Sequence, residues 1–339
     1  MADKPVIAID AMGGDNAPAE IVKGAAEALN AFDVHMILLG KQTLVETELH
    51  KYDYPKDKIT VVNCNETIDA TDTPTTAIKQ KKDSSMVAGF NLLKNGGADA
   101  LVSAGSTGAL LAGATFIVGR IPGVERPSLA TMLPNENRFS LMLDSGANVD
   151  CKPSYLAQFA RMGAVYMENV AGVASPKVGL INIGTEKEKG NQLVKEAYAL
   201  LESSGLNFTG NIEARDIPSG VCDVIVCDGF IGNIILKYTE GFAQSMFGMI
   251  KKELMKDTFS KIGALLSKRA YANLKKSFDY SEVGGAPFLG LKALVVKAHG
   301  SSDAKAIAGA VKQAVIFTEK DVVNKIKTNI QTYEKPQGV

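Results

Sequence analysis

The sequence has few cysteines, no net charge and no long apolar run, and each absence excludes a class of protein. Its four cysteines show no CxxC spacing and have no histidine neighbours, so we expect neither a metal site nor a redox motif. Lys plus Arg equals Asp plus Glu at 37 each, so no overall field attracts nucleic acid. No apolar run approaches the roughly 20 residues that span a bilayer, and the amino terminus lacks a signal-peptide pattern. These absences predict a cytoplasmic globular protein.

Short β-branched runs alternate with longer helical patterns along the whole chain. This alternation is typical of βαβ units and of a largely parallel sheet with helices on both faces. We expect a single α/β catalytic domain over residues 1–335, with a helical arm at about residues 240–280. The expected strands are residues 6–10, 36–39, 59–62, 100–103, 129–133, 141–144, 178–183, 208–212, 224–227 and 294–297.

One segment, residues 246–278, differs in composition from the rest of the chain. It carries eight Lys or Arg and two acidic residues, a local net charge of +6. Apolar residues recur among them at spacings of three and four, which predicts basic amphipathic helices that project from the domain. Two interpretations remain open, namely an arm that docks on an anionic partner and core helices with a solvated basic face.

Six turns rich in glycine or asparagine follow the expected strands, and ligands of open α/β sheets gather at such strand ends. In VSAGSTGAL, exposed backbone amides at a helix start favour an anion site. The same residues also suit a turn in which glycine only admits the helix against the sheet. The six turns are DAMGGDNAP, VSAGSTGAL, LDSGANVD, INIGTEKEKGN, CDGFIGN and KAHGSSDAK.

Two of these turns carry candidate charged groups. Lys187 and Lys189 lie in INIGTEKEKGN, and lysine offers phosphate a point charge. We expect Lys189 to reach an anion at the same strand edge as VSAGSTGAL, and Lys187 to be solvated. His299 could donate a proton or bind phosphate, although a histidine at a strand end also serves as an ordinary hydrogen-bonded residue. Ser301 or Ser302 is expected to cap the helix that follows.

Acidic side chains at the strand ends brace loops, cap helices or contact substrate. We assign bracing and capping to Asp10 and Asp228, because their spacing offers no metal-ligand pattern. Asp144 and Asn148, in LDSGANVD, are better placed to contact substrate. No GxSxG elbow or Ser-His-Asp order is visible.

Taken together, these turns resemble the bacterial phosphate acyltransferase family of phospholipid synthesis. RPSLATMLP, GNIEAR and GGAPFLGLKALVV extend the resemblance, which covers nearly the whole chain in order. It implies conversion of acyl carrier protein thioesters to acyl phosphates, which a membrane acyltransferase uses to acylate glycerol 3-phosphate. It also implies a homodimer, no cofactor, and a three-layer α/β/α, Rossmann-like fold related to phosphotransacetylase and isopropylmalate dehydrogenase. The family usually has asparagine at the position of Ser106 and an aliphatic residue at that of Ser145.

Since phosphate is a nucleophile and a thiol leaves readily, we expect direct attack on the thioester without an acyl-enzyme. The expected catalytic residues are Lys189, Asp144, Asn148 and His299. The expected phosphate and substrate residues are Gly13, Gly14, Asp15, Ser103, Gly105, Ser106, Thr107, Gly108, Asn182, Gly184, Asn191, Gly229, Asn233 and Ser301. The arm residues expected to dock on acyl carrier protein, or on the anionic inner face of the cell membrane, are Lys261, Leu265, Lys268 and Arg269.

Two other functions remain as alternatives. A nicotinamide-dependent dehydrogenase suits the general fold, but the first turn reads AMGGDNAP instead of GxGxxG. A non-enzymatic membrane scaffold would explain the basic helices, but it leaves the six strand-end turns without a purpose.

Overall fold

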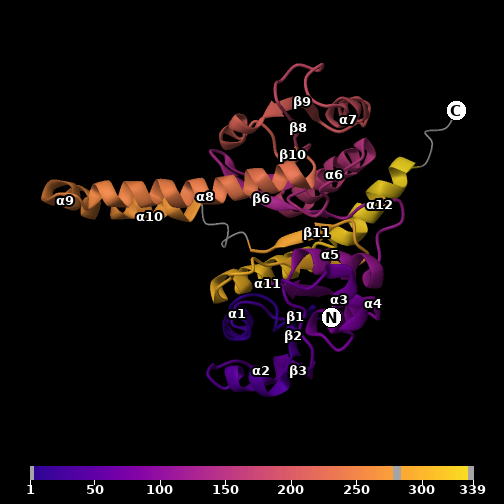
Figure 1. The fold of residues 1–339 in the computed structure, drawn as a ribbon, viewed down its shortest axis with the longest axis vertical. Coiled ribbons are helices and arrows are strands. Elements are labelled where there is room, and N and C mark those ends of the chain that lie inside the picture. Colours follow the sequence, from indigo (N-terminus) through magenta and orange to yellow (C-terminus); the bar gives the residue numbers. More distant parts are fainter. Residues whose placement is uncertain (1–3, 278–283, 335–339) are drawn as a thin grey trace.

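The computed structural model describes residues 4–277 and 284–334, and it contains two β-sheets instead of one (Figure 1). We call the seven-stranded sheet with its helices the first lobe, and the five-stranded sheet with its helices the second lobe. The first sheet runs in the order β3 (Ile59–Asn63), β2 (His35–Gly40), β1 (Val6–Asp10), β4 (Ala100–Ser103), β12 (Leu294–Lys297), β11 (Ala286–Leu289) and β5 (Ser128–Leu129). The second runs β6 (Thr131–Asn135), β7 (Arg138–Leu143), β10 (Val224–Val226), β8 (Val178–Asn182) and β9 (Phe208–Glu213).

Helices cover both faces of the first sheet, because its strands bury apolar side chains on both sides. Along β1, Ile7 and Ile9 belong to one hydrophobic cluster and Ala8 to another, which is the period of two of a strand. One face packs against α1 (Ala19–Leu29), α2 (Gln42–Leu49) and α11 (Ala304–Glu319). The other packs against α3 (Pro74–Gln80), α4 (Ser85–Lys94) and α5 (Thr107–Gly113), which a π-turn extends over Ala114–Val118. The three-layer α/β/α prediction is thus confirmed.

The second lobe is covered mainly on one face, by α6 (Pro153–Tyr166) and α7 (Gln192–Glu202). Ile7 of β1 and Leu141 of β7 belong to the same hydrophobic cluster, so one cluster includes strands of both lobes. The last helix, α12 (Val322–Glu334), packs on α6. The remaining described elements are short helical segments at Lys56–Lys58, Met167–Ala171 and Ala214–Ser219.

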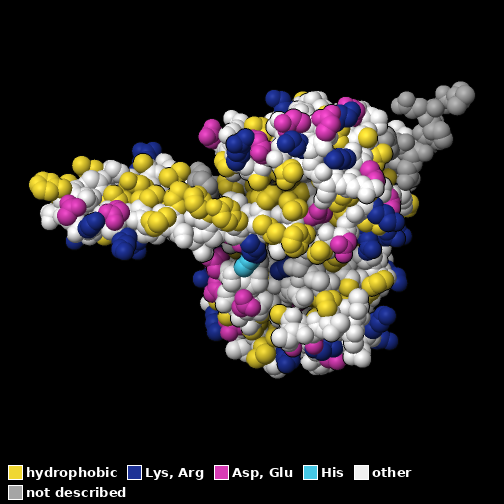
Figure 2. All heavy atoms as spheres, turned by 45° about the horizontal axis from the view of Figure 1, so that its top comes forward, with side chains coloured by type: hydrophobic (Ala, Val, Ile, Leu, Met, Phe, Trp, Pro, Cys, Tyr) yellow, Lys and Arg dark blue, Asp and Glu magenta, His cyan; other side chains and the backbone are white. Residues whose placement is uncertain are grey.

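The projecting arm is confirmed as helical over the described residues. It consists of α8 (Gly229–Leu254), α9 (Thr258–Leu266) and α10 (Lys268–Ser277), and Figure 1 shows it leaving the body of the protein. Phe278, the last residue of the expected segment, lies outside the described residues. Apolar side chains run along the arm and onto the body (Figure 2). None of the described helices is both long enough and apolar enough to cross a membrane.

The single strand expected over residues 129–133 is wrong. The chain forms β5 in the first sheet and β6 in the second, with Ala130 between them. The amide of Ala130 donates to the Pro287 carbonyl at 3.0 Å, whereas the Leu129 amide donates to Asp144 Oδ1 at 2.9 Å. Hydrogen bonds to residues that are distant in the sequence therefore place the two parts of one apolar run in different sheets. The antiparallel strand β11 was not expected, because GGAPFL contains glycine and proline, which are uncommon inside strands.

Candidate active site

Three of the glycine turns lie side by side at the carboxyl ends of β1, β4 and β12, which are neighbours in the first sheet. The amide of Asp15 donates to the Gly300 carbonyl at 2.8 Å. Gly14 has φ +99°, and a Cβ there would lie 2.8 Å from Ala104 Cβ and 2.9 Å from Gly300 O. Glycine is required at this position because DAMGGDNAP packs directly on the other two turns.

The other three turns form a second group, at the ends of β7, β10 and β8 in the second sheet. The amide of Gly229 donates to Asn148 O at 2.7 Å, which joins CDGFIGN to LDSGANVD. The expectation that Lys189 shares a strand edge with VSAGSTGAL is wrong, because β8 and β4 belong to different sheets.

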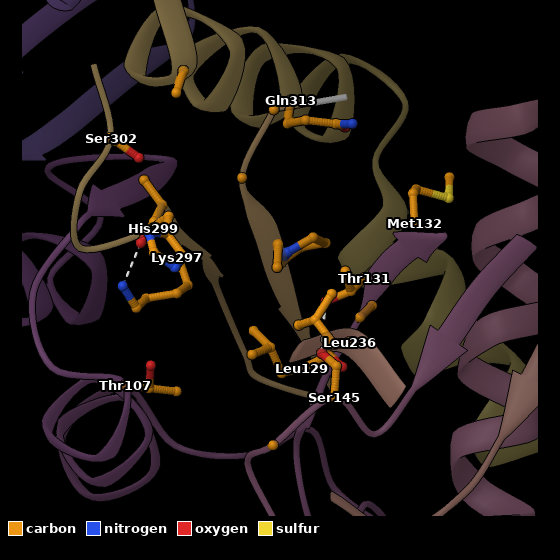
Figure 3. A pocket seen from close by; sticks show the side chains of 18 of the residues that line it. Thr107, Leu129, Thr131, Met132, Ser145, Leu236, Lys297, His299, Ser302 and Gln313 are labelled. Atoms are coloured by element: carbon orange, nitrogen blue, oxygen red, sulfur yellow. Dashed lines mark hydrogen bonds between the residues drawn. The ribbon is translucent and has the colours of Figure 1, made fainter. Parts of the chain in front are cut away.

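A cavity of about 440 Å³ lies between the two groups of turns (Figure 3). Residues of both lobes form its walls. They include residues of the first turns of α8 and of the strands β5, β6 and β11. The described lining residues are Thr107, 129–132, Ser145, Gly146, Tyr166, Asn233, Leu236, Lys237, Glu240, 284–287, 297–300, Ser302, Ala306 and Gln313.

Of the residues expected to act on substrate, Thr107, Asn233 and His299 line this cavity. Lys189 is exposed in the loop after β8 and is not among the described lining residues. Asn182 braces that loop, since its Nδ2 donates to Lys189 O at 3.1 Å. Asn191, one of the expected phosphate and substrate residues, caps α7 by accepting the Val194 amide at 3.0 Å.

Asp144 and Asn148 are buried behind the cavity wall. The Asp144 carboxylate accepts the amides of Leu129 at 2.9 Å and Asn148 at 2.5 Å, and also Asn148 Nδ2 at 2.9 Å. Burial raises the pKa of Asp144, and these hydrogen bonds oppose that rise. The described contacts of this carboxylate therefore brace the point where the chain passes between the sheets.

Asp10 has the bracing position expected of it. Its carboxylate accepts the Ser85 and Ser103 hydroxyls, each at 2.6 Å, and burial raises its pKa. Ser103 Oγ in turn accepts the Gly105 amide at 3.0 Å. Ser103 and Gly105 thus support the VSAGSTGAL turn from inside, and Ser106 is the N-cap residue of α5.

Lys297, which the sequence reasoning missed, lies at the end of β12 and lines the cavity. Its ammonium donates to the carbonyls of Ala104, at 3.2 Å, and of Ala298. Burial lowers the pKa of Lys297 to about 8, although Asp10 and Asp15 oppose the shift. The sequence does carry a signal for Lys297, namely a lysine that ends an apolar strand just before a glycine turn. The same pattern, however, is typical of a lysine that is exposed to solvent at a strand end.

The two ring nitrogens of His299 have different neighbours. Nδ1 accepts the Ser301 amide at 3.3 Å. Burial and the neighbouring Lys237 lower the pKa of His299. Nε2 lies 3.4 Å from the Lys237 ammonium, which can only donate, and both side chains line the cavity. A cation beside the imidazole suits the stabilisation of a negative oxygen there.

The helix cap expected at Ser301 or Ser302 is wrong. Asp303 caps α11, because its Oδ1 accepts the Ala306 amide at 2.9 Å. Ser301 Oγ lies 2.8 Å from His299 Nδ1 instead. Asp228 does cap α8, accepting the Ile231 amide at 2.8 Å.

The chain resembles proteins of known activity and known fold. A family model described as "Fatty acid synthesis protein" matches residues 6–325. The phosphate acyltransferase of Alkaliphilus oremlandii is 53% identical over 96% of this chain and 97% of its own length, and that of Clostridium kluyveri is 50% identical over 96% and 98%.

Solved structures share the fold at low sequence identity. A phosphotransacetylase from Streptococcus pyogenes matches with a TM-score of 0.63 at 20% identity, over 96% of this chain and 95% of that one. A 4-hydroxythreonine-4-phosphate dehydrogenase from Klebsiella pneumoniae matches with a TM-score of 0.53 at 13% identity, over 93% and 100%. The predicted likeness to phosphotransacetylase is confirmed at the level of the fold.

Proposed function

The chain belongs to the fatty acid synthesis protein family, and we propose that its activity, that of a phosphate acyltransferase, takes place in the cavity between the lobes. Such an enzyme transfers a fatty acyl group from acyl carrier protein to inorganic phosphate. The product is an acyl phosphate for phospholipid synthesis.

One observation carries the location. The cavity has a partly buried ammonium, Lys297, and an imidazole, His299, on the first-lobe wall, and apolar Leu129, Met132 and Leu236 among its other lining residues. Phosphate requires the cation, and an acyl chain requires the apolar surface. The two kinds of surface meet in one cavity, as a reaction between an anion and a lipid thioester requires.

The reaction we propose is direct. A phosphate oxygen attacks the thioester carbonyl, an O–C bond forms, and the C–S bond breaks with the electron pair leaving on sulfur as a thiolate. His299 and the Lys237 ammonium beside it stabilise the carbonyl oxygen as negative charge develops on it, and Lys297 neutralises the phosphate. Lys189 remains a proposed additional phosphate ligand from the second lobe.

The experiment incubates the protein with acyl carrier protein thioester and phosphate and detects acyl phosphate by mass spectrometry. The expected product depends on both substrates. Reaction with a nicotinamide cofactor, or liposome binding without acyl transfer from any donor, would favour the dehydrogenase or the scaffold instead.

The cysteines are unsuited to act as nucleophiles. Burial raises the pKa of Cys64 to about 11 and that of Cys222 to about 12, and the same cause raises the pKa of Cys151 and Cys227. A thiolate is the reactive form, so these thiols are inert near neutral pH.

We therefore expect a variant with all four cysteines replaced by alanine to keep its turnover, with no acyl group attached to the protein. Steady-state rates and intact-protein mass spectrometry measure both quantities. A folded variant without turnover, or a trapped acyl-enzyme, contradicts the direct mechanism.

We also propose a homodimer formed along α8. One face of α8 carries exposed apolar residues at a spacing of four, namely Phe230, Ile234, Tyr238 and Phe242. Tyr238 is 70% exposed. Rings of Tyr238 and Phe242 stack at 5.9 Å, so the exposed face is continuous. A contiguous apolar face of this kind supports a protein interface.

The end of the arm is the proposed docking surface for acyl carrier protein, for an anionic membrane that carries the glycerol-phosphate acyltransferase, or for both. Phe259 and Leu266 are 88% and 82% exposed, beside exposed Lys261, Lys268 and Arg269. Apolar and basic groups on one helical surface support binding at a lipid headgroup boundary.

Reversing the charge of Lys261, Lys268 and Arg269 to glutamate is expected to raise the KM for acyl carrier protein thioester, to weaken sedimentation with anionic liposomes, or to do both. Because each basic residue near an anionic surface adds to binding, we expect an effect of more than roughly tenfold.

The matched control reverses three exposed lysines of the body, Lys312, Lys325 and Lys327, which changes the net charge equally. If the arm variant and this control change the KM and the liposome sedimentation equally, the basic face of the arm is exposed to solvent and has no docking role.

A further inference from the structure

Ser302 carries a buried hydroxyl that the fold does not use. Its side chain lines the cavity, the residue is only 5% exposed, and its Oγ has no hydrogen-bond partner among the described residues. Buried polar side chains nearly always have a partner, because leaving one unpaired destabilises the fold. The Ser302 hydroxyl therefore indicates a group that the bound state supplies.

The position of Ser302 is fixed by its backbone. Its amide donates to His299 O at 3.1 Å, and its carbonyl accepts Asn16 Nδ2 at 3.2 Å. Capping does not account for the hydroxyl, because Asp303 caps α11. The serine is thus held at the wall while its side chain makes no described structural contact.

The surroundings of this hydroxyl suit an anion. Lys297 and His299 line the same wall, and Figure 3 shows Ser302 on their side of the cavity. The Lys297 ammonium is largely buried and its described hydrogen bonds are to backbone carbonyls, so no carboxylate has a hydrogen bond to it. Phosphate offers several acceptor oxygens, which a cation and a neighbouring hydroxyl can share.

We propose that the Ser302 hydroxyl, together with the Lys297 ammonium, binds the oxygens of the attacking phosphate and orients it toward the thioester. This assignment rests on the proposed function and adds to it the residue that positions the nucleophile. The phosphate group of the acyl carrier's prosthetic arm has the same chemistry, so the test separates the two sources.

The test replaces Ser302 by alanine and measures the KM for inorganic phosphate and that for acyl carrier protein thioester separately. Since a hydrogen bond to a charged group is lost, we expect the KM for phosphate to rise by about tenfold, with the KM for the thioester unchanged. A rise only in the KM for the thioester would assign the hydroxyl to the donor and overturn the proposal.

Ser128→Ala is the matched control. Ser128 is also fully buried with an unpartnered Oγ, but it is not among the described lining residues of the cavity. We expect its KM for phosphate to equal that of the unaltered protein. Equal changes in both variants would mean that the effect is structural, and would overturn the assignment.

A second measurement needs no acyl donor. Phosphate alone is expected to raise the thermal unfolding temperature of the unaltered protein, and to do so much less in Ser302→Ala. If the unaltered protein binds phosphate in this way but transfers no acyl group, the proposed function fails and the site stands. If Ser302→Ala responds to phosphate as the unaltered protein does, the site fails.

Discussion

Replacing Lys297 by methionine is expected to lower kcat/KM for phosphate by roughly 10- to 150-fold, the usual loss when a charge-assisted contact with the phosphate is removed. The partly buried ammonium lines the cavity wall, where it is a cation available to the phosphate. Steady-state kinetics with phosphate as the varied substrate measure the loss. Methionine has a similar length, and burial already disfavours the charged form of Lys297, so the variant should fold.

The lowered pKa of Lys297 predicts that the use of phosphate depends on pH. Burial lowers the pKa of Lys297 to about 8, so the ammonium is the main form below that pH and is lost above it. We expect phosphate use by the unaltered protein to decline above about pH 8. Lys297→Met should lack this decline, and a similar decline in both proteins would assign it to another group.

Lys189→Ala provides the comparison. A charge-assisted contact with phosphate would make this substitution cost roughly 10- to 150-fold in apparent phosphate affinity. An unchanged KM for phosphate would rule Lys189 out and leave Lys297 as the cation that matters.

The largest effect on stability is expected from Gly232→Ala. Gly232 lies in the first turns of α8, and a Cβ there would come within 1.9 Å of Asp144 O and 3.1 Å of Cys227 Sγ. The nearest atom is backbone, so the helix must move away from the second sheet. We expect the free energy of unfolding to fall by about 3 kcal/mol, the upper range for overpacking a core.

Gly248→Ala is the matched control, because Gly248 lies in the same helix and a Cβ there would meet nothing within 4 Å. Alanine favours helix over glycine by up to about 1 kcal/mol, so this variant should be as stable as the unaltered protein or slightly more so. Denaturant unfolding compares the two. Equal stability of Gly232→Ala and Gly248→Ala would contradict the close approach of α8 to Asp144.

Local features of the chain could be predicted from the sequence, because they depend on residues close to one another. The strands Val6–Asp10 and Leu294–Lys297 have the predicted bounds, since each is a short apolar run that ends at a turn. The cap at Asp228 and the helical arm were predicted correctly for the same reason. The family followed from short motifs, each of which is continuous in the sequence.

Only the tertiary structure decided which of these pieces meet. Residues 129–133 look like one strand, yet hydrogen bonds to Asp144 and Pro287 divide them between two sheets. Lys189 and Lys297 are equivalent as sequence signals, since both are lysines near a strand-end turn. The tertiary structure places Lys189 in an exposed loop of the second lobe and Lys297 in the cavity wall. Burial and its effect on the pKa of Lys297 arise from neighbours that are distant in the sequence, and no local pattern encodes them.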